Sequence, residues 1–177
     1  VNKRLTARLV GRGVRALGIS GVDAGLLRAR QLTHPAGDLG RVGEVTAVDI
    51  ECLRALVAEG FTPVVSPISL GDDWRPFNVN ADHAALAVAA ALHVPEMIFL
   101  TNVPGVLQDG AVVSELPARQ AQEMIATGVI NGGMIPKVRS ALAAIEAGVG
   151  AARITDLAGL GAGTGTRVLA SPITQQA

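Results

Sequence analysis

The sequence predicts an α/β fold, a three-layer αβα sandwich in which helices cover both faces of a mostly parallel central sheet. Short apolar runs such as residues 62–66 and 97–100 alternate with longer segments of helical pattern such as 80–92. Strands that are buried on both faces are continuously apolar, as is typical of parallel sheets. The 177 residues, 49% hydrophobic and 17% charged, suffice for a compact globular domain with a hydrophobic core.

The first sixty residues predict two helices, a strand and a hairpin. Leu5, Leu9 and Val10 share one face at helical spacing, and Gly11 or Gly13 ends that helix. The chain begins inside this helical pattern, with Val and without an N-cap, so we expect further sequence before it. The other expected elements are a buried strand at 15–20, a β-hairpin of 26–32 and 39–45 with a polar tip at 35–38, and a helix at 49–60 that ends on glycine.

The remaining residues predict a regular alternation of strands and helices. Residues 80–92 are rich in alanine and apolar nearly all round, so we expect that helix to be buried. Ligands in such folds lie beyond the carboxyl ends of the strands. The expected strands are 62–66, 97–100, 151–155 and 166–170, and the expected helices are 80–92, 118–127 and 137–147.

Composition narrows the class of protein. The formal net charge is zero and the basic residues are scattered, so non-specific binding to nucleic acid or to a membrane surface is not indicated. The only cysteine, Cys52, cannot form an internal disulfide, which fits a reducing cytoplasm. We find no apolar stretch of membrane-spanning length and no signal peptide, and we expect a cytoplasmic protein.

A polar segment, Asn78-Val79-Asn80-Ala81-Asp82, comes directly before the alanine-rich helix. Asn80 is a good N-cap, and Asp82 in the first turn complements the helix dipole, so a structural role suffices for both residues. Asn78 is not needed as a cap, and its amide could bind a carboxylate or phosphate oxygen. Asp82 could also hold the ammonium group of a lysine.

A second segment, Asn131-Gly132-Gly133-Met134-Ile135-Pro136-Lys137, leads into a helix. Pro136 fits the first turn, and the free backbone N–H groups there form an anion site. A cation such as Lys137 is unfavourable near a helix N-terminus by about 0.3–1 kcal/mol, a penalty that a bound phosphate would remove. The alternative is a solvated lysine after an ordinary loop.

A third segment, Leu100-Thr101-Asn102-Val103-Pro104-Gly105-Val106, directly follows a buried strand. The carboxyl end of a parallel strand is where a nucleotide binds in such folds. A tight turn at Pro104-Gly105 is the structural alternative. The glycine-rich stretch 161–165 lacks the phosphate-loop pattern and is interpreted as a plain loop.

The order of these segments resembles the amino acid kinase family, and within it the N-acetylglutamate kinases most closely. The resemblance covers essentially the whole chain. It is carried by Val1-Asn2-Lys3, Asp38-Leu39-Gly40-Arg41-Val42-Gly43-Glu44-Val45, Pro63-Val64-Val65-Ser66-Pro67, Asn78-Val79-Asn80-Ala81-Asp82, Thr101-Asn102-Val103-Pro104-Gly105-Val106, Gly132-Gly133-Met134-Ile135-Pro136-Lys137 and Gly163-Thr164-Gly165-Thr166.

That family uses MgATP to phosphorylate the side-chain carboxylate of N-acetyl-L-glutamate, an early step of arginine biosynthesis. The resemblance implies Mg²⁺ held mainly through the nucleotide phosphates, with no metal-ligating residue of the chain. It also implies two lobes: residues 1–60 as part of a substrate and dimer lobe with a hairpin lid, and 61–177 as a nucleotide-binding lobe. The implied site residues are Lys137 and Asp82 for catalysis, Asn78, Asn80, Gly43 and Val42 for the substrate, and Thr101, Asn102, Gly105, Val106, Gly132, Gly133 and Met134 for the nucleotide.

The resemblance also sets expectations for the chain as a whole. Many family members have Asp at the position of Asn102. The family's other catalytic lysine, its glycine-rich loop and its substrate-binding arginine would precede Val1, so we expect these 177 residues alone to be inactive. The alternatives are an acetylaminoadipate kinase of lysine biosynthesis and a non-catalytic module that binds a nucleotide or a partner. Family members form homodimers or larger homo-oligomers, and we expect the same here.

Overall fold

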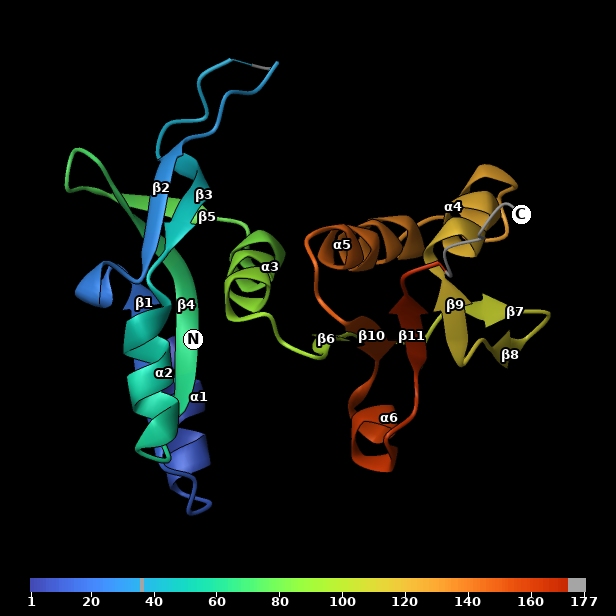
Figure 1. The fold of residues 1–177 in the computed structure, drawn as a ribbon, viewed down its shortest axis with the longest axis horizontal. Helices are drawn as coiled ribbons and strands as arrows, with labels where there is room; N and C mark the ends of the chain where they lie inside the picture. Colours follow the sequence, from blue (N-terminus) through green and yellow to red (C-terminus); the bar gives the residue numbers. More distant parts are fainter. Residues whose placement is uncertain (36, 172–177) are drawn as a thin grey trace, which may run out of the picture. The chain divides into compact units, whose positions relative to one another are not determined.

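The computed structural model describes residues 1–35 and 37–171, so Ala36 of the predicted hairpin tip lies outside the described residues. The chain divides into two compact units, Val1–Ala91 and Leu92–Ala177. Each unit has its own mixed, mostly parallel sheet with flanking helices, which confirms the α/β class (Figure 1). The described strands form a five-stranded sheet, a four-stranded sheet and a small two-stranded sheet.

The first unit contains a five-stranded sheet of order β1-β4-β2-β3-β5. β1 and β2 both run parallel to β4, and β3 runs parallel to β5. The predicted hairpin is confirmed, because β2 and β3 pair antiparallel. A second antiparallel pair, β4 and β5, was not predicted. The strands are β1 (Ala16–Gly21), β2 (Leu27–Gln31), β3 (Val42–Val48), β4 (Thr62–Gly71) and β5 (Pro76–Val79).

Helix α1 is fixed to this sheet by its first turn. The Nδ2 of Asn2 donates to the carbonyl oxygens of Ile19 in β1 at 3.1 Å and Val64 in β4 at 2.6 Å. Gly18 allows the close approach, because a Cβ there would lie 2.5 Å from Thr6 Oγ1. The helical elements of the unit are α1 (Asn2–Val10), the short 3₁₀ helix η1 (Asp23–Gly25), α2 (Ile50–Ala58) and α3 (Ala81–Leu92).

The second unit contains a four-stranded sheet of order β6-β10-β11-β9 and a small two-stranded sheet. Helix α5 packs on β6, β10 and β11, and α4 packs on β9, β11 and α5. The strands are β6 (Met97–Leu100), β7 (Leu107–Gln108), β8 (Ala111–Val112), β9 (Glu115–Pro117), β10 (Ala151–Thr155) and β11 (Thr166–Leu169). The helices are α4 (Ala118–Ala126), α5 (Met134–Glu146) and α6 (Leu157–Ala162).

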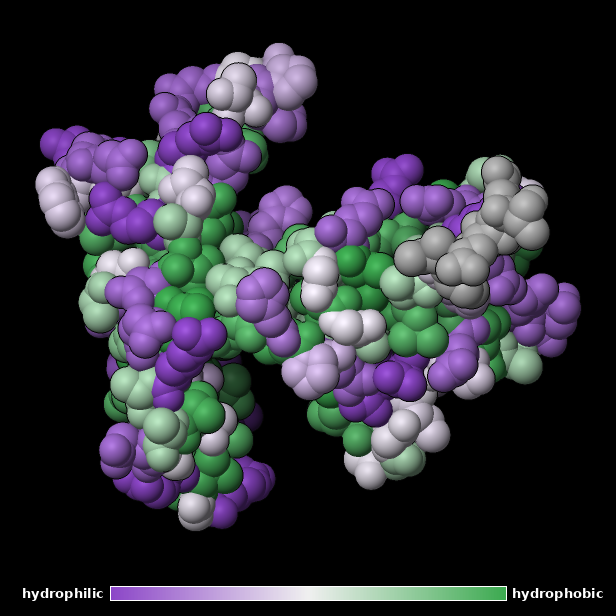
Figure 2. All heavy atoms as spheres, viewed as in Figure 1, coloured by the Kyte–Doolittle hydropathy of each residue, from purple (hydrophilic) through white to green (hydrophobic). Residues whose placement is uncertain are grey.

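Each unit has its own buried apolar side chains. In the first they include Leu26, Leu27, Ala29, Phe77 and Val79. Those of the second unit include Val106, Leu116, Val138, Ala141, Ile154 and Val168. Figure 2 shows that mostly hydrophilic residues cover the end of hairpin β2–β3 and the turn between β4 and β5.

The structure corrects one expectation about α3 and extends another about α5. Only Ala84 and Ala89 are buried in α3, so the prediction of a buried helix was wrong. Alanine favours a helix by propensity and adds little apolar area, so an alanine-rich pattern is weak evidence for burial. Helix α5 begins at Met134, three residues before the predicted start, because Pro136 is accommodated in its first turn.

The compact units divide at residues 91 and 92, whereas the predicted lobes divide at residues 60 and 61. Strands β4 and β5 pair with the strands of residues 1–60 in the sheet of the first unit. The assignment of 61–177 to nucleotide binding remains a prediction, since compactness alone does not identify a ligand.

Candidate functional site

Lys137 lies one turn into α5 and is half-buried against the carboxyl end of β6. Its Nζ donates to Thr101 Oγ1 at 2.7 Å and lies 3.4 Å from Asn102 Oδ1. The second and third polar segments predicted from the sequence therefore meet. This is the edge of a parallel sheet where ligands of α/β folds bind, because β6 and β10 run in the same direction.

The loop after β6 is held in place by two threonines. Thr101 Oγ1 accepts a hydrogen bond from the backbone N–H of Val103 at 3.2 Å. Thr166 Oγ1, fully buried at the start of β11, accepts one from the N–H of Val106 at 2.8 Å. Gly105 has a φ of +155°, and a Cβ there would lie 2.6 Å from Thr166 Oγ1. Glycine is required at this position both for the backbone conformation and for space.

An apolar pocket of about 280 Å³ opens beside this loop. Pockets for small molecules have volumes of about 300–1,000 Å³ and are mainly apolar with a few polar groups, so this one is at the small end of that range. Three predicted nucleotide residues line it: Gly105, Val106 and Met134. The other lining residues are Val103, Pro104, Leu107, Val129, Ile130 and Asn131.

The remaining predicted nucleotide residues are placed differently. Gly132 and Gly133 precede α5, with no side chain within 4 Å of an added Cβ, and they do not line the pocket. Sequence reasoning missed Leu107 as a lining residue. It lies in a two-residue strand, which is too short to give a periodic pattern, so only the spatial arrangement identifies it.

The predicted substrate residues of the first unit are neighbours in its sheet. In the parallel pairing of β3 and β5, Val42 lies opposite Asn78 and Gly43 lies opposite Val79. Phe77 and Val79 point into the core, so the exposed side chain of Asn78 faces the other side of the strand. Gly43 is required by space, because a Cβ there would lie 2.9 Å from Phe77 Cβ.

Asn80 and Asp82 form the N-terminus of α3. Asn80 Oδ1 accepts hydrogen bonds from the N–H groups of Asp82 at 2.9 Å and His83 at 3.3 Å, which is N-capping geometry. The structural role predicted for Asn80 is therefore confirmed. Asp82 is exposed in the first unit and Lys137 belongs to the second, so their predicted pairing remains a prediction.

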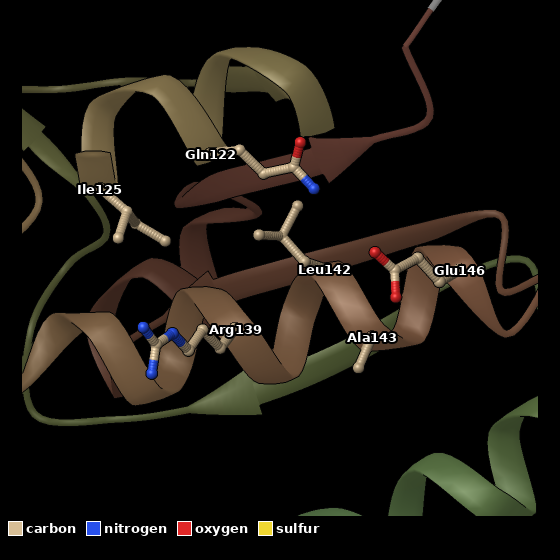
Figure 3. Close-up of a pocket in the computed structure, with 6 residues that line it drawn as sticks. All are labelled: Gln122, Ile125, Arg139, Leu142, Ala143 and Glu146. Carbon is tan, nitrogen blue, oxygen red and sulfur yellow. The ribbon is translucent and has the colours of Figure 1, made fainter. Parts of the chain in front are cut away.

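A different hollow, of about 350 Å³, lies between α4 and α5 in the second unit (Figure 3). None of the predicted site residues lines it, so it is not part of the candidate site. Its lining residues are Gln122, Ile125, Arg139, Leu142, Ala143 and Glu146.

The described residues contain no group of three or more His, Cys, Asp or Glu side chains placed to bind a metal ion. Over the same residues, none of the helices combines the length and the apolar character needed to span a membrane.

Known proteins are similar to the chain over most of its length. The acetylglutamate kinase of Roseiflexus sp. (strain RS-1) is 59% identical over 160 residues, which make up 90% of this chain and 61% of that protein. The solved structure of smu.665 from Streptococcus mutans UA159 is 34% identical, with a TM-score of 0.81, over 97% of this chain and 67% of that one. N-acetylglutamate synthase from Neisseria gonorrhoeae, solved with coenzyme A and N-acetyl-glutamate, is 25% identical, with a TM-score of 0.83, over 97% of this chain and 41% of that one.

The sequence model of the amino acid kinase family matches residues 1–156. This range includes all the predicted site residues, from Val42 in the hairpin to Lys137 in α5. The resemblance drawn from the short motifs is confirmed, and the chain belongs to the amino acid kinase family.

Proposed function

We propose that the protein is an acetylglutamate kinase, which transfers a phosphoryl group from MgATP to the side-chain carboxylate of N-acetyl-L-glutamate in arginine biosynthesis. One observation carries the proposal: the Lys137 ammonium contacts the side-chain oxygens of Thr101 and Asn102, and the residues that follow them, from Val103 on, line an apolar pocket. The 59% identity to an acetylglutamate kinase supports the choice of substrate.

The nucleotide occupies the second unit in this proposal. Its base lies in the pocket lined by Gly105, Val106 and Met134, and its phosphates lie near the start of α5. Backbone N–H groups at a helix N-terminus attract anions, and Met134 begins the helix that carries Lys137. Mg²⁺ is held mainly through the nucleotide phosphates, as the resemblance implies.

The chemistry requires positive charge and alignment. A carboxylate with a pKa of about 4.3 is ionised at neutral pH, so its oxygen can attack the γ-phosphorus without a general base. Lys137 then stabilises the charge on the transferring group as the bond to the leaving oxygen breaks. Its partners in the second unit, Thr101 and Asn102, offer neutral oxygens and bring no negative charge that would compete with the phosphates.

The acetylated substrate is held by the first unit. Asn78 binds its α-carboxylate, and hairpin strand β3 with Val42 and Gly43 covers it. Asn80 uses its oxygen to cap α3, which leaves its amide N–H groups available to the substrate. Asp82 orients the catalytic lysine, as the resemblance implies. We also propose a homodimer, for which the exposed Leu5 and Val10 of α1 offer apolar surface.

The test is acyl phosphate formation, trapped with hydroxylamine as the hydroxamate. The chain spans 61% of its Roseiflexus relative, and we expect activity from a protein of the relative's full length but not from these 177 residues alone. Lys137→Met should lower kcat about 10²–10³-fold, as removal of a group that stabilises a transition state does. Arg139→Met, on the exposed side of the same helix, is the matched control and should leave kcat unchanged.

Other outcomes are equally informative. Faster turnover of acetylaminoadipate than of acetylglutamate would identify the lysine-pathway enzyme, a discrimination that rests on one methylene worth about 1–3 kcal/mol. If the full-length protein binds MgATP by calorimetry but phosphorylates neither substrate, it is a nucleotide-binding module. Full activity of Lys137→Met would contradict the role given to this residue.

A further inference from the structure

We propose that Arg41 is a positioning residue for the carboxylate substrate: it fixes Asn78 against the hairpin strand β3 through a clamp on three successive residues of β5. The inference rests on the proposed function, since it concerns the residue that binds the substrate there.

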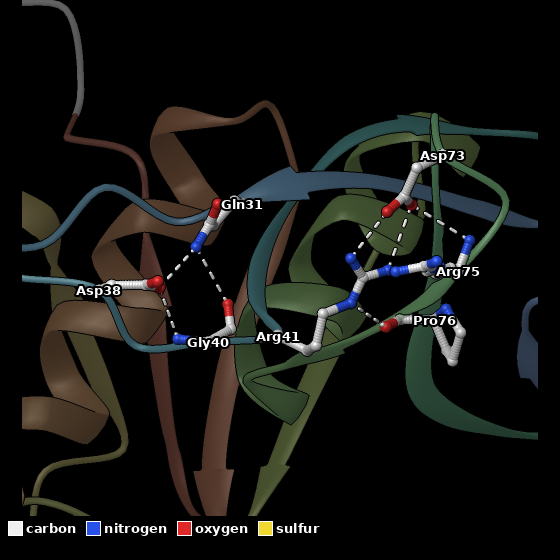
Figure 4. Close-up of polar contacts among 7 residues, drawn as sticks. All are labelled: Gln31, Asp38, Gly40, Arg41, Asp73, Arg75 and Pro76. Atoms are coloured by element: carbon white, nitrogen blue, oxygen red, sulfur yellow. Dashed lines mark hydrogen bonds and ion pairs between the residues drawn. The ribbon is translucent and has the colours of Figure 1, made fainter.

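The guanidinium of Arg41 makes three polar contacts to the segment before Asn78 (Figure 4). Its Nη1 lies 2.7 Å from Asp73 Oδ2, and its Nη2 lies 3.2 Å from Asp73 Oδ1. Its Nε donates to the carbonyl oxygen of Pro76 at 3.2 Å. Such a forked contact fixes direction as well as distance, because the guanidinium is planar and its donors are rigidly spaced.

The same guanidinium lies over the ring of Phe77, 4.2 Å from the ring centroid. Phe77 is buried, and two glycines give its ring room. An added Cβ would lie 2.5 Å from Phe77 Cε2 at Gly71 and 2.9 Å from Phe77 Cβ at Gly43. The ring is therefore closely packed against both glycines, and the Arg41 guanidinium covers one of its faces.

The backbone of Arg41 holds Asn78, the residue that follows Phe77 in β5. Its carbonyl oxygen accepts a hydrogen bond from the N–H of Asn78 at 2.8 Å. Arg41 thus contacts Pro76 by its Nε, Phe77 by its charged plane and Asn78 by its main chain. Because alternate side chains of a strand face opposite ways, fixing Phe77 inward fixes the Asn78 amide outward.

Asp73 is itself held in place. One of its oxygens accepts a hydrogen bond from the N–H of Arg75 at 3.1 Å, within the turn between β4 and β5. The hydrogen bonds from Arg41 lower the pKa of Asp73 to about 2, so this carboxylate stays ionised at every physiological pH. The Arg41–Asp73 ion pair therefore stays charged on both sides over that pH range.

The exposure of the Arg41 and Asp73 side chains indicates that the clamp positions Asn78 more than it stabilises the fold. The side chains of Arg41 and Asp73 are 44% and 48% exposed, and ion pairs in that environment contribute little to the free energy of unfolding. Loss of the clamp should consequently change the geometry of Asn78 more than the stability of the fold. A variant with a higher KM for the substrate and an unchanged thermal midpoint would indicate a positioning role, whereas a fall in the thermal midpoint would indicate a structural role.

The test compares Arg41→Ala and Arg41→Lys in the full-length enzyme. A misplacement of about 1 Å in a binding group lowers rates about 10²-fold, so we expect kcat/KM for acetylglutamate to fall about 10–100-fold, mainly through KM. KM for ATP and the thermal midpoint should stay near wild type. Lysine keeps the positive charge but lacks the planar guanidinium with its fixed donors, so Arg41→Lys should not restore the wild-type KM for acetylglutamate. Arg30→Ala, which breaks the Arg30–Glu44 pair of the same hairpin, is the matched control.

Amide hydrogen exchange gives a measurement that needs no activity. The N–H of Asn78 should exchange faster in both Arg41 variants and at the wild-type rate in Arg30→Ala. An unchanged KM for acetylglutamate in an active enzyme overturns the inference, as does unchanged exchange at Asn78. If wild type has no acetylglutamate kinase activity but Asn78 exchanges faster in the variants, the proposed function fails while the clamp stands.

Discussion

Thr166→Val tests whether the loop beside the nucleotide pocket depends on one buried hydroxyl. Thr166 is fully buried, and its Oγ1 is the acceptor for the N–H of Val106, which is 1% exposed. Valine has nearly the same shape but no oxygen, so the substitution leaves a buried donor without a partner. The free energy of unfolding should fall by about 1–3 kcal/mol, the cost of such a group.

Urea denaturation measures this loss. With a dependence of about 2 kcal/mol per molar urea, the midpoint should fall by about 0.5–1.5 M. Thr164→Val is the control two residues away: its side chain is exposed, and the change should stay within about 0.5 kcal/mol. Because Val106 lines the pocket, affinity for ATP should fall with stability in Thr166→Val alone.

Thr166→Ser sharpens the comparison, since serine keeps the oxygen and loses only a methyl group. It should retain most of the ATP affinity that valine loses. The reasoning is refuted if Thr166→Val shifts the urea midpoint no more than Thr164→Val does. It is also refuted if valine and serine reduce ATP affinity equally, because the acceptor would then be irrelevant.

Two further predictions concern the first unit. Gly43→Ala should destabilise the fold by about 1–3 kcal/mol in thermal unfolding, because the new Cβ meets Phe77, whereas Gly161→Ala has open space and should not. The pKa of Asp73, lowered from 3.8 to about 2 in the fold, makes its contribution to stability complete above the ordinary pKa and lost as pH falls through about 2. Because both side chains of the pair are about half exposed, this contribution is small, and the thermal midpoint of Asp73→Asn should fall only slightly less steeply between these pH values than that of wild type. A steeper fall in the variant would contradict the assignment.

Much of the fold was predictable because its elements carry strong local patterns. The apolar runs of β6 and β10 and the hairpin β2–β3 stand out from their surroundings. Strand β5 does not, because it has four residues, begins with proline and is exposed at every second position. It becomes a strand by pairing with β3 and β4, which lie earlier in the chain. Its own four residues give no sign of this pairing.

The candidate site was predictable in part for the same reason. The rule that ligands bind at the carboxyl ends of parallel strands placed Thr101 near a ligand, and the anion site of a helix N-terminus placed Lys137 near a phosphate. It did not predict that Lys137 would donate directly to Thr101, because side-chain rotamers are set by packing. The clamp of Arg41 on Asp73 was likewise missed, since the two residues are far apart in sequence and neither belongs to a recognisable pair.

The neutral partners of Lys137 have a consequence for how the protein meets a nucleotide. Within the described part of its unit, no carboxylate forms an ion pair with this ammonium, so no acidic side chain of that unit weakens its electric field. At 0.1 M salt that field decays over about 10 Å, so dilute buffer lengthens its reach and concentrated salt shortens it. The rate at which a nucleotide associates with this site should therefore fall as salt is added.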